Sequence, residues 1–249
     1  MGASLTQAGT REWHAVRSDV QMIFQDPLAS RDPRMTIGQI IAEPLTEHRP
    51  GIGKQEIDAR VRAMMNRVGL REQMINRYPH EFYGGQCQRI GIARALIVEP
   101  KLVICDEPVS VLDVSIQAQI VNLLKSLQAE MKLSLIFIAH DLAVVRHISD
   151  RVMVMYLGRV MELADKHALY DTPRHPYARA LLSAVPVPDL SIERAKTVQI
   201  LSGDIPSPIN PPSGCVFHTL CPIADARCAS KVPTLRALEA GVSAACFYA

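Results

Sequence analysis

The chain has 249 residues, of which 48% are hydrophobic and 21% are charged, and its formal net charge is +2. This composition is typical of a folded globular protein and argues against a disordered chain. The small net charge does not favour a nucleic-acid partner, and no apolar run approaches the roughly 18–20 residues of a membrane-spanning helix. The first residues lack the apolar segment of a secretory signal, so we expect a cytoplasmic protein whose six cysteines are thiols or metal ligands.

Residues 1–17 are polar and carry no periodic pattern. Residues 20–24, Val-Gln-Met-Ile-Phe, are the first predicted strand, and a polar turn that begins at Gln25 follows it. Further along, apolar side chains recur at helical spacing over residues 57–68, and Gly69 is suited to end that helix. The two adjacent methionines of this helix are expected to pack in the core rather than to contact a cofactor.

Residues 82–113, FYGGQCQRIGIARALIVEPKLVICDEPVSVLD, are the most informative stretch. Two glycines precede a helical pattern, and the free backbone N–H groups at the start of such a helix are suited to bind a phosphate. The apolar strand that follows ends in two adjacent carboxylates, Asp106 and Glu107. Open α/β sheets bind their ligands at that end of the strands. One carboxylate there could hold Mg²⁺ through water, and its neighbour could polarise an attacking water.

The next segments predict a helix, a strand and a hairpin. Residues 114–131 place apolar side chains on one helical face, and Asp113 is suited to cap that helix. Residues 134–139 predict another buried strand, which ends in His140. A single histidine at the end of a strand is usually structural, so its place among the other motifs has to decide its role. Residues 152–162 predict a hairpin.

In their order and spacing, these motifs resemble those of the ATP-binding subunits of ABC transporters. VQMIFQDP resembles the Q-loop, YGGQ the signature motif, LVICDE the Walker B strand, SVLD the D-loop, and the strand end at His140 the H-loop. The resemblance implies an α/β fold of the P-loop NTPase type, with a helical subdomain at about residues 35–97. It also implies the site residues, which are Glu107, His140 and Gln25 for catalysis and Asp106, Gly84, Gly85, Gln86 and Asp113 for binding ATP and Mg²⁺.

Two features depart from that family's pattern. No P-loop of the form G-x-x-x-x-G-K-S/T occurs in the 249 residues. We therefore expect an ATPase domain that lacks its N-terminal strands and the P-loop, and whose own ATP site is defective. The signature also has Tyr83 where the family has a serine that contacts the γ-phosphate. Because the tyrosine hydroxyl sits at the end of a long ring, the same contact is geometrically doubtful.

Beyond residue 172 the composition changes, since this tail holds most of the prolines and four of the six cysteines. Its motifs resemble the C-terminal extension of oligopeptide and dipeptide import ATPases, at residues 175–177, 203–208 and 211–215. We therefore expect a truncated ABC ATPase domain at residues 1–172 and a small extension rich in cysteine and proline at residues 173–249.

The tail cysteines are Cys215, Cys221, Cys228 and Cys246. They include no C-x-x-C pair, so their spacing does not indicate zinc. The resemblance implies an iron–sulfur cluster held by four such cysteines, and reduced thiols in a loop-rich lobe are an equal alternative. Cys87 and Cys105 lie in a helix start and a core strand, where packing is the better interpretation.

The resemblance implies a peripheral subunit on the cytoplasmic face of a bacterial inner membrane, which couples ATP hydrolysis to peptide import. It implies two membrane-spanning permease subunits, a second ATPase subunit and a peptide-binding protein as partners, and no nucleic acid. A non-catalytic docking subunit, or an inactive relic of such a transporter, is the alternative. A soluble ABC protein of DNA repair or translation is disfavoured by the peptide-importer tail.

Overall fold

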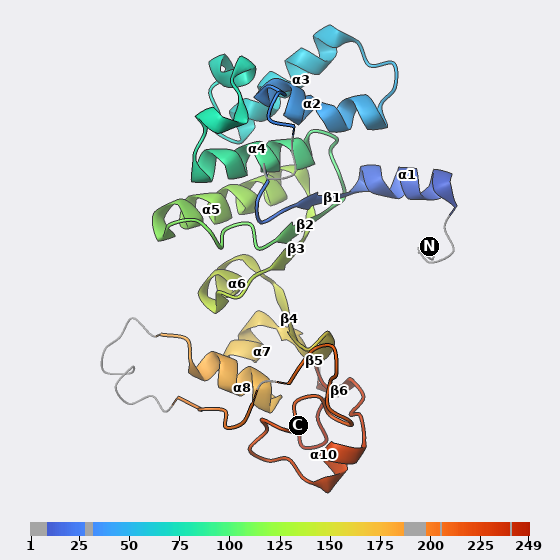
Figure 1. Cartoon of the computed structure of the whole chain (residues 1–249), viewed down its shortest axis with the longest axis vertical. Helices are drawn as coiled ribbons and strands as arrows, with labels where there is room; N and C mark the ends of the chain where they lie inside the picture. The colour runs from blue at the N-terminus through green and yellow to red at the C-terminus, as the bar shows by residue number, and fades with distance from the viewer. Residues whose placement is uncertain (1–8, 28–31, 187–197, 205, 240) are drawn as a thin grey trace. The chain divides into compact units, whose positions relative to one another are not determined.

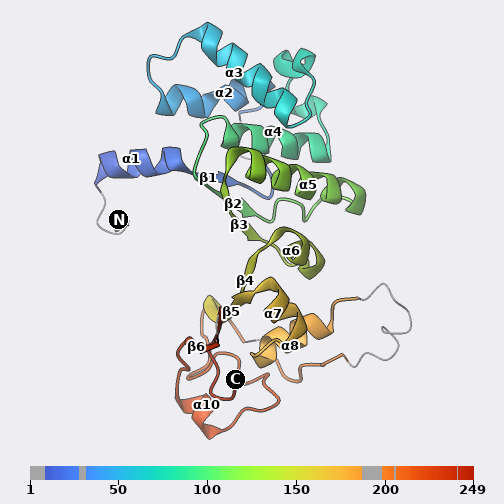
Figure 2. The same cartoon turned by 180° about the vertical axis from the view of Figure 1, so that it is seen from behind.

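The computed structural model describes residues 9–27, 32–186, 198–204, 206–239 and 241–249. Residues 1–8 and Ile205, which belongs to one of the tail motifs, lie outside this part of the chain. Two units are distinguished by their internal contacts, Met1–His140 and Asp141–Ala249 (Figures 1 and 2).

A parallel sheet of three strands forms the centre of the first unit, in the order β1-β2-β3. The apolar runs of the sequence predict these strands, which are β1 (Val20–Ile23), β2 (Leu102–Asp106) and β3 (Ser134–Ile138). β2 is the middle strand, and Cys105 near its end is fully buried. Because Cys105 is in register with Ile23 on one side and Phe137 on the other, the carboxyl ends of all three strands lie at the same edge.

Two helices lie beside these strands, α4 (Gly84–Leu96) and α5 (Val114–Met131) (Figure 1). α4 contacts both β1 and α5. α5 is the crossover that two parallel strands in succession require, because it joins β2 to β3. Its buried residues share one face, which confirms the predicted helix: Ile120, Val121, Leu124 and Leu127.

The remaining helices of this unit are α1 (Thr10–Asp19), α2 (Ile37–His48), α3 (Lys54–Arg67), η2 (Glu72–Asn76) and η3 (Pro79–Glu81). α3 confirms the helix predicted before Gly69, and Gly69 has a positive φ of 74° just beyond the helix end. Met64 and Met65 of α3 are buried, which confirms that they pack in the core. No sequence pattern predicts α1, because most of its residues are polar.

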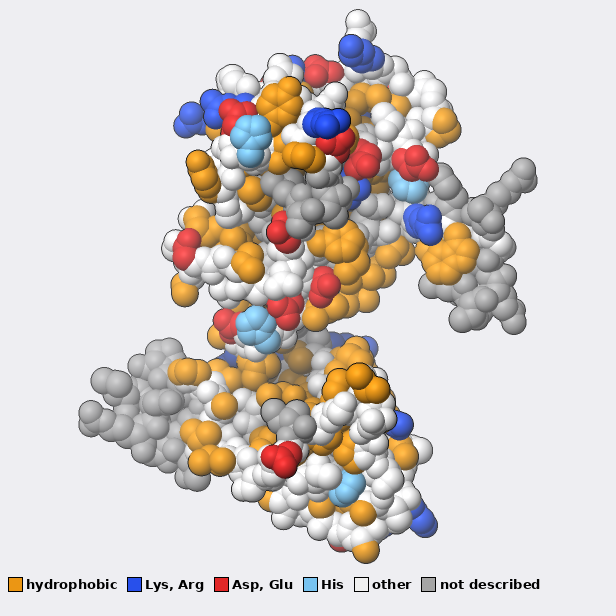
Figure 3. All heavy atoms as spheres, viewed as in Figure 1, with side chains coloured by type: hydrophobic (Ala, Val, Ile, Leu, Met, Phe, Trp, Pro, Cys, Tyr) orange, Lys and Arg blue, Asp and Glu red, His pale blue; other side chains and the backbone are white. Residues whose placement is uncertain are grey.

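β3 lies at the edge of the described sheet, and its Ile136 and Ile138 side chains are 47% and 46% exposed. Strands of parallel sheets are usually buried on both faces. Hydrophobic side chains are visible among charged ones on the surface of this unit in Figure 3. Among the described residues, therefore, no neighbour fully covers the face of β3 that carries Ile136 and Ile138.

The second unit contains an antiparallel sheet of four strands in the order β4-β5-β7-β6. Its strands are β4 (Arg151–Tyr156), β5 (Arg159–Asp165), β6 (Arg236–Glu239) and β7 (Val242–Ala244). β4 and β5 confirm the predicted hairpin, in which Leu157 and Gly158 turn the chain with positive φ values of 45° and 74°. This sheet combines strands from both sides of the domain boundary predicted at residue 172.

The helices of the second unit are α6 (Leu142–Ile148), α7 (Lys166–Asp171), α8 (Pro176–Ser183) and α10 (Ala226–Ser230). Phe217 is at the centre of its core, fully buried, with its ring centroid 5.5 Å from that of Tyr156 and 5.2 Å from that of Tyr177. Nowhere in the described parts of the chain is a helix long and apolar enough to span a membrane.

Candidate functional site

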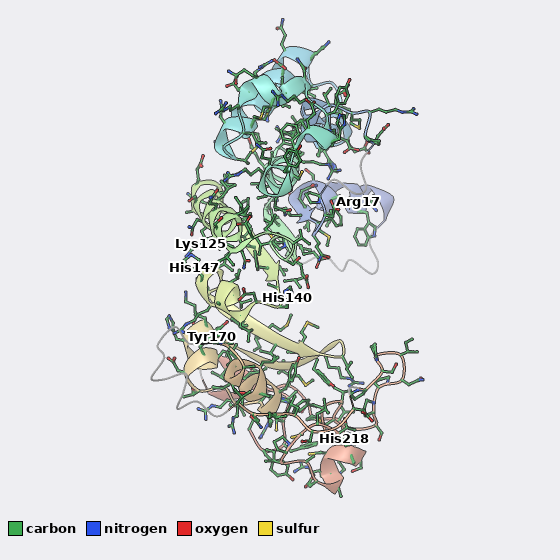
Figure 4. All side chains as sticks on the ribbon, turned by 60° about the vertical axis from the view of Figure 1, so that its left-hand side comes forward. Arg17, Lys125, His140, His147, Tyr170 and His218 are labelled. Carbon is green, nitrogen blue, oxygen red and sulfur yellow. The ribbon has the colours of Figure 1, made fainter. Side chains whose placement is uncertain are left out.

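Gln25 and His140 converge on the carboxylate of Glu107. Gln25 follows β1, Glu107 follows β2 and His140 follows β3, so the strand ends bring them together (His140 is labelled in Figure 4). The Nε2 atom of Gln25 donates to Oε2 of Glu107 at 3.4 Å, and Nδ1 of His140 lies 3.5 Å from Oε1. Each carboxylate oxygen therefore has its own neighbour.

The backbone of Glu107 is unusual, with a φ of +44°. Non-glycine residues rarely adopt this left-handed conformation, and when they do they are often found at functional sites. Three hydrogen bonds hold it. The N–H of Glu107 donates to the carbonyl of Ile138 at 3.0 Å, and the carbonyl of Glu107 accepts from Ser110 Oγ at 3.1 Å and from the Ser110 N–H at 3.3 Å. Gln25 Nε2 also donates to Ser110 Oγ at 3.1 Å, so Ser110 and Glu107 are fixed together.

This cluster is open to solvent. The Glu107 side chain is 33% exposed and the His140 side chain is 70% exposed. Asp106, the last residue of β2, is half-buried and directly precedes Glu107. A partly exposed carboxylate with a fixed orientation can hold and polarise a water molecule, and an adjacent carboxylate can bind a divalent cation through water.

Asp113 caps helix α5, as its sequence position predicts. Its Oδ1 atom accepts hydrogen bonds from the backbone N–H groups of Ser115 at 3.1 Å and Ile116 at 3.0 Å, and from the Ser115 hydroxyl at 2.7 Å. The hydrogen bond from the Ser115 side chain, together with those from the backbone, lowers the pKa of the Asp113 carboxyl. The structure therefore gives Asp113 a capping role.

Gly84, Gly85 and Gln86 form the first turn of α4. Gly84 has a positive φ of 34°, and a Cβ atom on Gly85 would lie 2.4 Å from Cγ2 of Ile116. Close packing between α4 and α5 therefore requires a glycine at position 85, whatever the turn binds. The N–H of Gln86 donates to the carbonyl of Tyr83 at 2.8 Å, and the Tyr83 side chain is 79% exposed.

All four tail cysteines, Cys215, Cys221, Cys228 and Cys246, line one small cavity of about 10 Å³ in the second unit. Phe217, Phe247 and Tyr248 are among the other residues of its wall. Burial raises the pKa of the Cys215, Cys221 and Cys228 thiols, and the neighbouring cysteines add to this effect. Within the described residues, however, no group of three or more His, Cys, Asp or Glu side chains is placed to hold a metal ion.

The other two cysteines have a different environment. Cys105 is fully buried in β2, and burial raises the pKa of its thiol to about 12. Cys87 is half-buried in α4, and burial raises the pKa of its thiol as well. Neither residue lines the cavity of the tail cysteines, so the packing interpretation fits both residues.

Glu162 and His175 are a buried pair that the motifs do not reveal. The Glu162 carboxylate accepts hydrogen bonds from the backbone N–H groups of Arg174, at 3.0 Å to each oxygen, and of His175, at 2.7 Å. His175 Nδ1 in turn accepts from the N–H of Tyr177 at 3.0 Å. Together they fix the start of α8. A glutamate between the apolar residues Met161 and Leu163 of β5 was the available sequence signal.

Two family models match the chain. The model described as "ABC transporter" matches residues 1–110, and the model described as "Oligopeptide/dipeptide transporter, C-terminal region" matches residues 161–228. The first match contains Gln25, Asp106 and Glu107, and the second contains Cys215, Cys221 and Cys228.

Curated relatives are similar over almost the whole chain. The oligopeptide transport ATP-binding protein OppF of Escherichia coli K12 is 67% identical over 94% of this chain and 70% of its own length. The OppF protein of Haemophilus influenzae is 64% identical, also over 94% of this chain and 70% of its own length. A putative peptide import ATP-binding protein of Brucella ovis is 56% identical over 98% of this chain and 76% of its own length.

Solved structures of lower identity share the fold. The structure of cbiO1 from Clostridium perfringens, part of the ABC transporter complex cbiONQ, matches with a TM-score of 0.60 and 27% identity over 66% of this chain and 64% of that chain. A dimeric structure of the ATP-binding cassette MJ0796 with ADP and Pi matches with a TM-score of 0.57 and 27% identity, over 64% of this chain and 68% of that chain.

Proposed function

This chain belongs to the ATP-binding subunits of ABC transporters, and on that premise we propose that it couples ATP hydrolysis to the import of oligopeptides. The names of the Escherichia coli and Haemophilus influenzae relatives include oligopeptide transport, and these relatives are 67% and 64% identical to this chain. The match of residues 161–228 to an oligopeptide/dipeptide transporter region supports the same substrate class. The structural observation in favour is the convergence of Gln25 and His140 on the Glu107 carboxylate.

In this proposal Glu107 holds and polarises the water that attacks the γ-phosphate. Its exposed fraction lets a water reach the carboxylate, and Gln25 and His140 hold its two oxygens in place. The Gln25 amide and the His140 imidazole would also contact the phosphate oxygens, on which negative charge develops during the reaction. Asp106 would hold Mg²⁺ through water at the end of β2.

Gly84 and Gly85 are proposed to face the ATP of a second ATPase subunit. They open α4, and backbone N–H groups at a helix start favour a phosphate. Because the N–H of Gln86 already donates to Tyr83, the two glycine N–H groups are the candidates for this contact. Asp113 would contribute indirectly, since it caps the helix against which Gly85 packs.

The proposed partners follow from the same family. Two membrane-spanning permease subunits, a second ATPase subunit and a peptide-binding protein would complete the transporter. The chain would then be a peripheral subunit on the cytoplasmic face of the inner membrane. The names of the relatives and the two family matches support this assignment.

The test is ATP hydrolysis by the transporter reconstituted in proteoliposomes with the chain or its Glu107→Gln variant. The amide of the variant has the shape of the carboxylate but no charge, so turnover should fall by roughly 10²–10⁴ if Glu107 acts on the water. Glu56→Gln is the matched control, because Glu56 is an exposed carboxylate in a surface pair with Arg60. A turnover that Glu107→Gln leaves unchanged would contradict the proposal.

A non-catalytic subunit is the second candidate. The observation that favours it is Tyr83, whose largely exposed ring takes the position of the signature serine that contacts the γ-phosphate in the family. If this candidate is right, the same assay will show transport-coupled ATP hydrolysis that needs this chain but is indifferent to Glu107→Gln.

We also propose that the four tail cysteines hold an iron–sulfur cluster. Four thiols around one cavity with aromatic walls are the donor set that such a cluster needs. The thiols would have to deprotonate and move closer together, because the described side chains do not yet form a metal-binding group. The bound cluster would supply a covalent link between the loops of the second unit.

Anaerobic purification followed by iron, sulfide and zinc analysis tests this. We expect iron and sulfide in stoichiometric amounts in the chain, and their loss in the Cys221→Ser variant. Cys87→Ser is the control, because Cys87 lies in α4 and does not line the cavity. No stoichiometric metal in the parent chain would favour plain thiols.

A further inference from the structure

Cys246 differs from the other tail cysteines in the way that it reaches the cavity. It follows β7 directly, after Ala245, whose N–H donates to the carbonyl of Met161 at 2.8 Å. From there residues 246–249 continue without regular structure, and Phe247 and Tyr248 line the cavity together with the four thiols. Cys246 is half-buried, as is Cys221, whereas Cys215 and Cys228 are buried. Its position therefore depends on what holds this segment.

One arginine side chain forms hydrogen bonds with the backbone of that segment. Nη2 of Arg236, on β6, donates to the backbone oxygens of Cys246 at 3.3 Å, Phe247 at 3.5 Å and Ala249 at 3.0 Å. β6 pairs with β7, so the arginine comes from the strand next to the one that leads into Cys246. Three backbone oxygens around one charged donor are an arrangement that fixes the path of a chain rather than one side chain.

The side chains after Cys246 are anchored to α10. The Arg227 guanidinium lies 4.1 Å from the ring centroid of Phe247, which is a cation–π contact. The Tyr248 hydroxyl donates to Oδ2 of Asp225. Oδ1 of the same carboxylate accepts from the N–H of Cys228 at 2.9 Å, so Asp225 connects Tyr248 to a second cysteine of the cavity.

The sulfur of Cys246 also accepts a hydrogen bond from this segment. The N–H of Tyr248 donates to Sγ of Cys246 at 3.4 Å, which holds the sulfur in its present orientation. This bond exists only while residues 246–248 keep their turn. The contacts of Arg236, Arg227 and Asp225 therefore fix the position of the Cys246 sulfur without touching its side chain.

We propose that residues 246–248 form a latch over the four-thiol cavity, and that Arg236, Arg227 and Asp225 are the positioning residues that keep it closed. Closed, the latch directs Cys246 into the cavity beside the other three thiols. Open, it exposes Cys246 and removes one of the four ligands. The latch would thus control when a metal group enters or leaves. Its metal-binding consequence rests on the proposed cluster, but the latch itself does not.

Site-resolved alkylation tests the latch. The metal-free, reduced chain is treated briefly with iodoacetamide, and the modified fraction of each cysteine is measured by mass spectrometry. Arg236→Ala should raise the rate at Cys246 by roughly 2- to 10-fold, the range expected when a few exposed hydrogen bonds are lost. Cys87 and Cys105 lie in the first unit and should be unaffected. Arg236→Lys should restore most of the protection, since an ammonium group also donates to carbonyls.

Two further variants complete this experiment. Tyr248→Phe removes only the hydroxyl that reaches Asp225, and it should raise the Cys246 rate in the same direction. Arg151→Ala is the matched control, because Arg151 is an exposed arginine on β4 of the same sheet. An unchanged Cys246 rate in Arg236→Ala and Tyr248→Phe would overturn the proposal. An equal rise at all four tail cysteines would also overturn it, because the whole lobe would then have opened.

A second measurement tests the latch proposal and the cluster proposal independently of each other. Co²⁺ is added to the reduced chain, and the thiolate-to-cobalt charge-transfer absorption is recorded for each variant. Arg236→Ala should weaken this absorption and Arg236→Lys should restore it. If alkylation shows the latch but neither iron, sulfide nor Co²⁺ binds, the latch stands and the cluster proposal fails. If metal binds equally well in all variants and alkylation does not change, the cluster stands and the latch fails.

Discussion

The imidazole of His175 is almost completely removed from water, with an exposed fraction of 1%. This burial lowers its pKa from 6.5 to about 4, although a hydrogen bond with the Ala245 backbone works in the opposite direction. The neutral ring is the form that accepts the Tyr177 N–H at Nδ1. Protonation would therefore remove a helix cap and bury a charge at the same time.

We predict a loss of stability in mild acid that depends on His175. Because its pKa is lower in the folded state, the unfolded chain binds more protons between about pH 6.5 and pH 4. The free energy of unfolding should keep its full contribution above about pH 6.5 and fall by roughly 2–3 kcal/mol by about pH 4. Glu162 offsets part of this loss, because burial raises the pKa of its carboxyl and protonation neutralises a buried charge.

Urea unfolding followed by circular dichroism at several pH values measures this loss. His175→Asn keeps an acceptor for the Tyr177 N–H but does not titrate, so its stability should change less over the same range. His167→Asn is the control, since His167 is exposed in α7. Equal pH dependence in His175→Asn and the parent chain would show that another group causes the loss.

The residues around Glu107 could be predicted from the sequence, but their arrangement could not. Motif order and spacing identify Gln25, Glu107 and His140, and parallel strands bring such strand ends together. The left-handed backbone of Glu107 has no local sequence signal, because it depends on hydrogen bonds from Ser110 and to Ile138. The Glu162–His175 pair was missed for a related reason, since the carboxylate binds backbone N–H groups that carry no sequence information.

At the scale of elements, Asp113 can be tested at the N-terminus of α5 for two different roles, as a helix cap or as a nucleotide-binding residue. We predict that Asp113→Ala lowers the free energy of unfolding, because the N–H groups of Ser115 and Ile116 lose their acceptor. Asp113→Asn should cost much less, since asparagine is an equally good cap. Urea midpoints of the two variants without nucleotide provide the comparison. If they shift alike, capping is not what Asp113 contributes.

The elements that the sequence predicts well are those with a strong apolar pattern of their own. β2 and β3 are continuous apolar runs, and α3 and α5 place their buried residues on one face. β6 and β7 have four and three residues and depend on pairing with each other and with β5, which lies far away in the sequence. That pairing also places β5 and the tail in one sheet, which no local pattern at residue 172 could indicate.

At the scale of the whole molecule, the sequence makes a prediction about nucleotide binding by the 249 residues alone. They contain Asp106, Glu107, His140 and Gln25 but no G-x-x-x-x-G-K-S/T loop, whose lysine and N–H groups supply most phosphate contacts. We therefore expect no saturable binding when ATP and Mg²⁺ are titrated into these 249 residues on their own in a calorimeter, and the hydrolysis proposed for Glu107 needs phosphate contacts from outside them. Micromolar binding that disappears in the Asp106→Asn variant would contradict this expectation.

The last prediction concerns the shared site of the assembled transporter. Tyr83 precedes the glycines at the start of α4, and its ring is largely exposed. In the proposed shared site, a partner subunit would bring its ATP to this helix start. A serine there would place its hydroxyl nearer to the helix start, and removal of the ring would let the two subunits close. Loss of one well-placed donor can lower a rate by roughly 10²–10³, so restoring one should produce a measurable increase. We expect Tyr83→Ser to raise the steady-state ATPase turnover of the reconstituted complex.

Two control variants are needed to interpret this experiment. Tyr78→Ser removes another exposed tyrosine of the same subdomain and should leave turnover unchanged. Gly85→Asp should abolish any contribution of the turn, because even a Cβ atom there would clash with Ile116. If Gly85→Asp stops hydrolysis while Tyr83→Ser changes nothing, the tyrosine is tolerated at the shared site. If neither variant has an effect, this chain adds nothing to catalysis at its partner's ATP, and the proposed contact of Gly84 and Gly85 with that nucleotide is wrong.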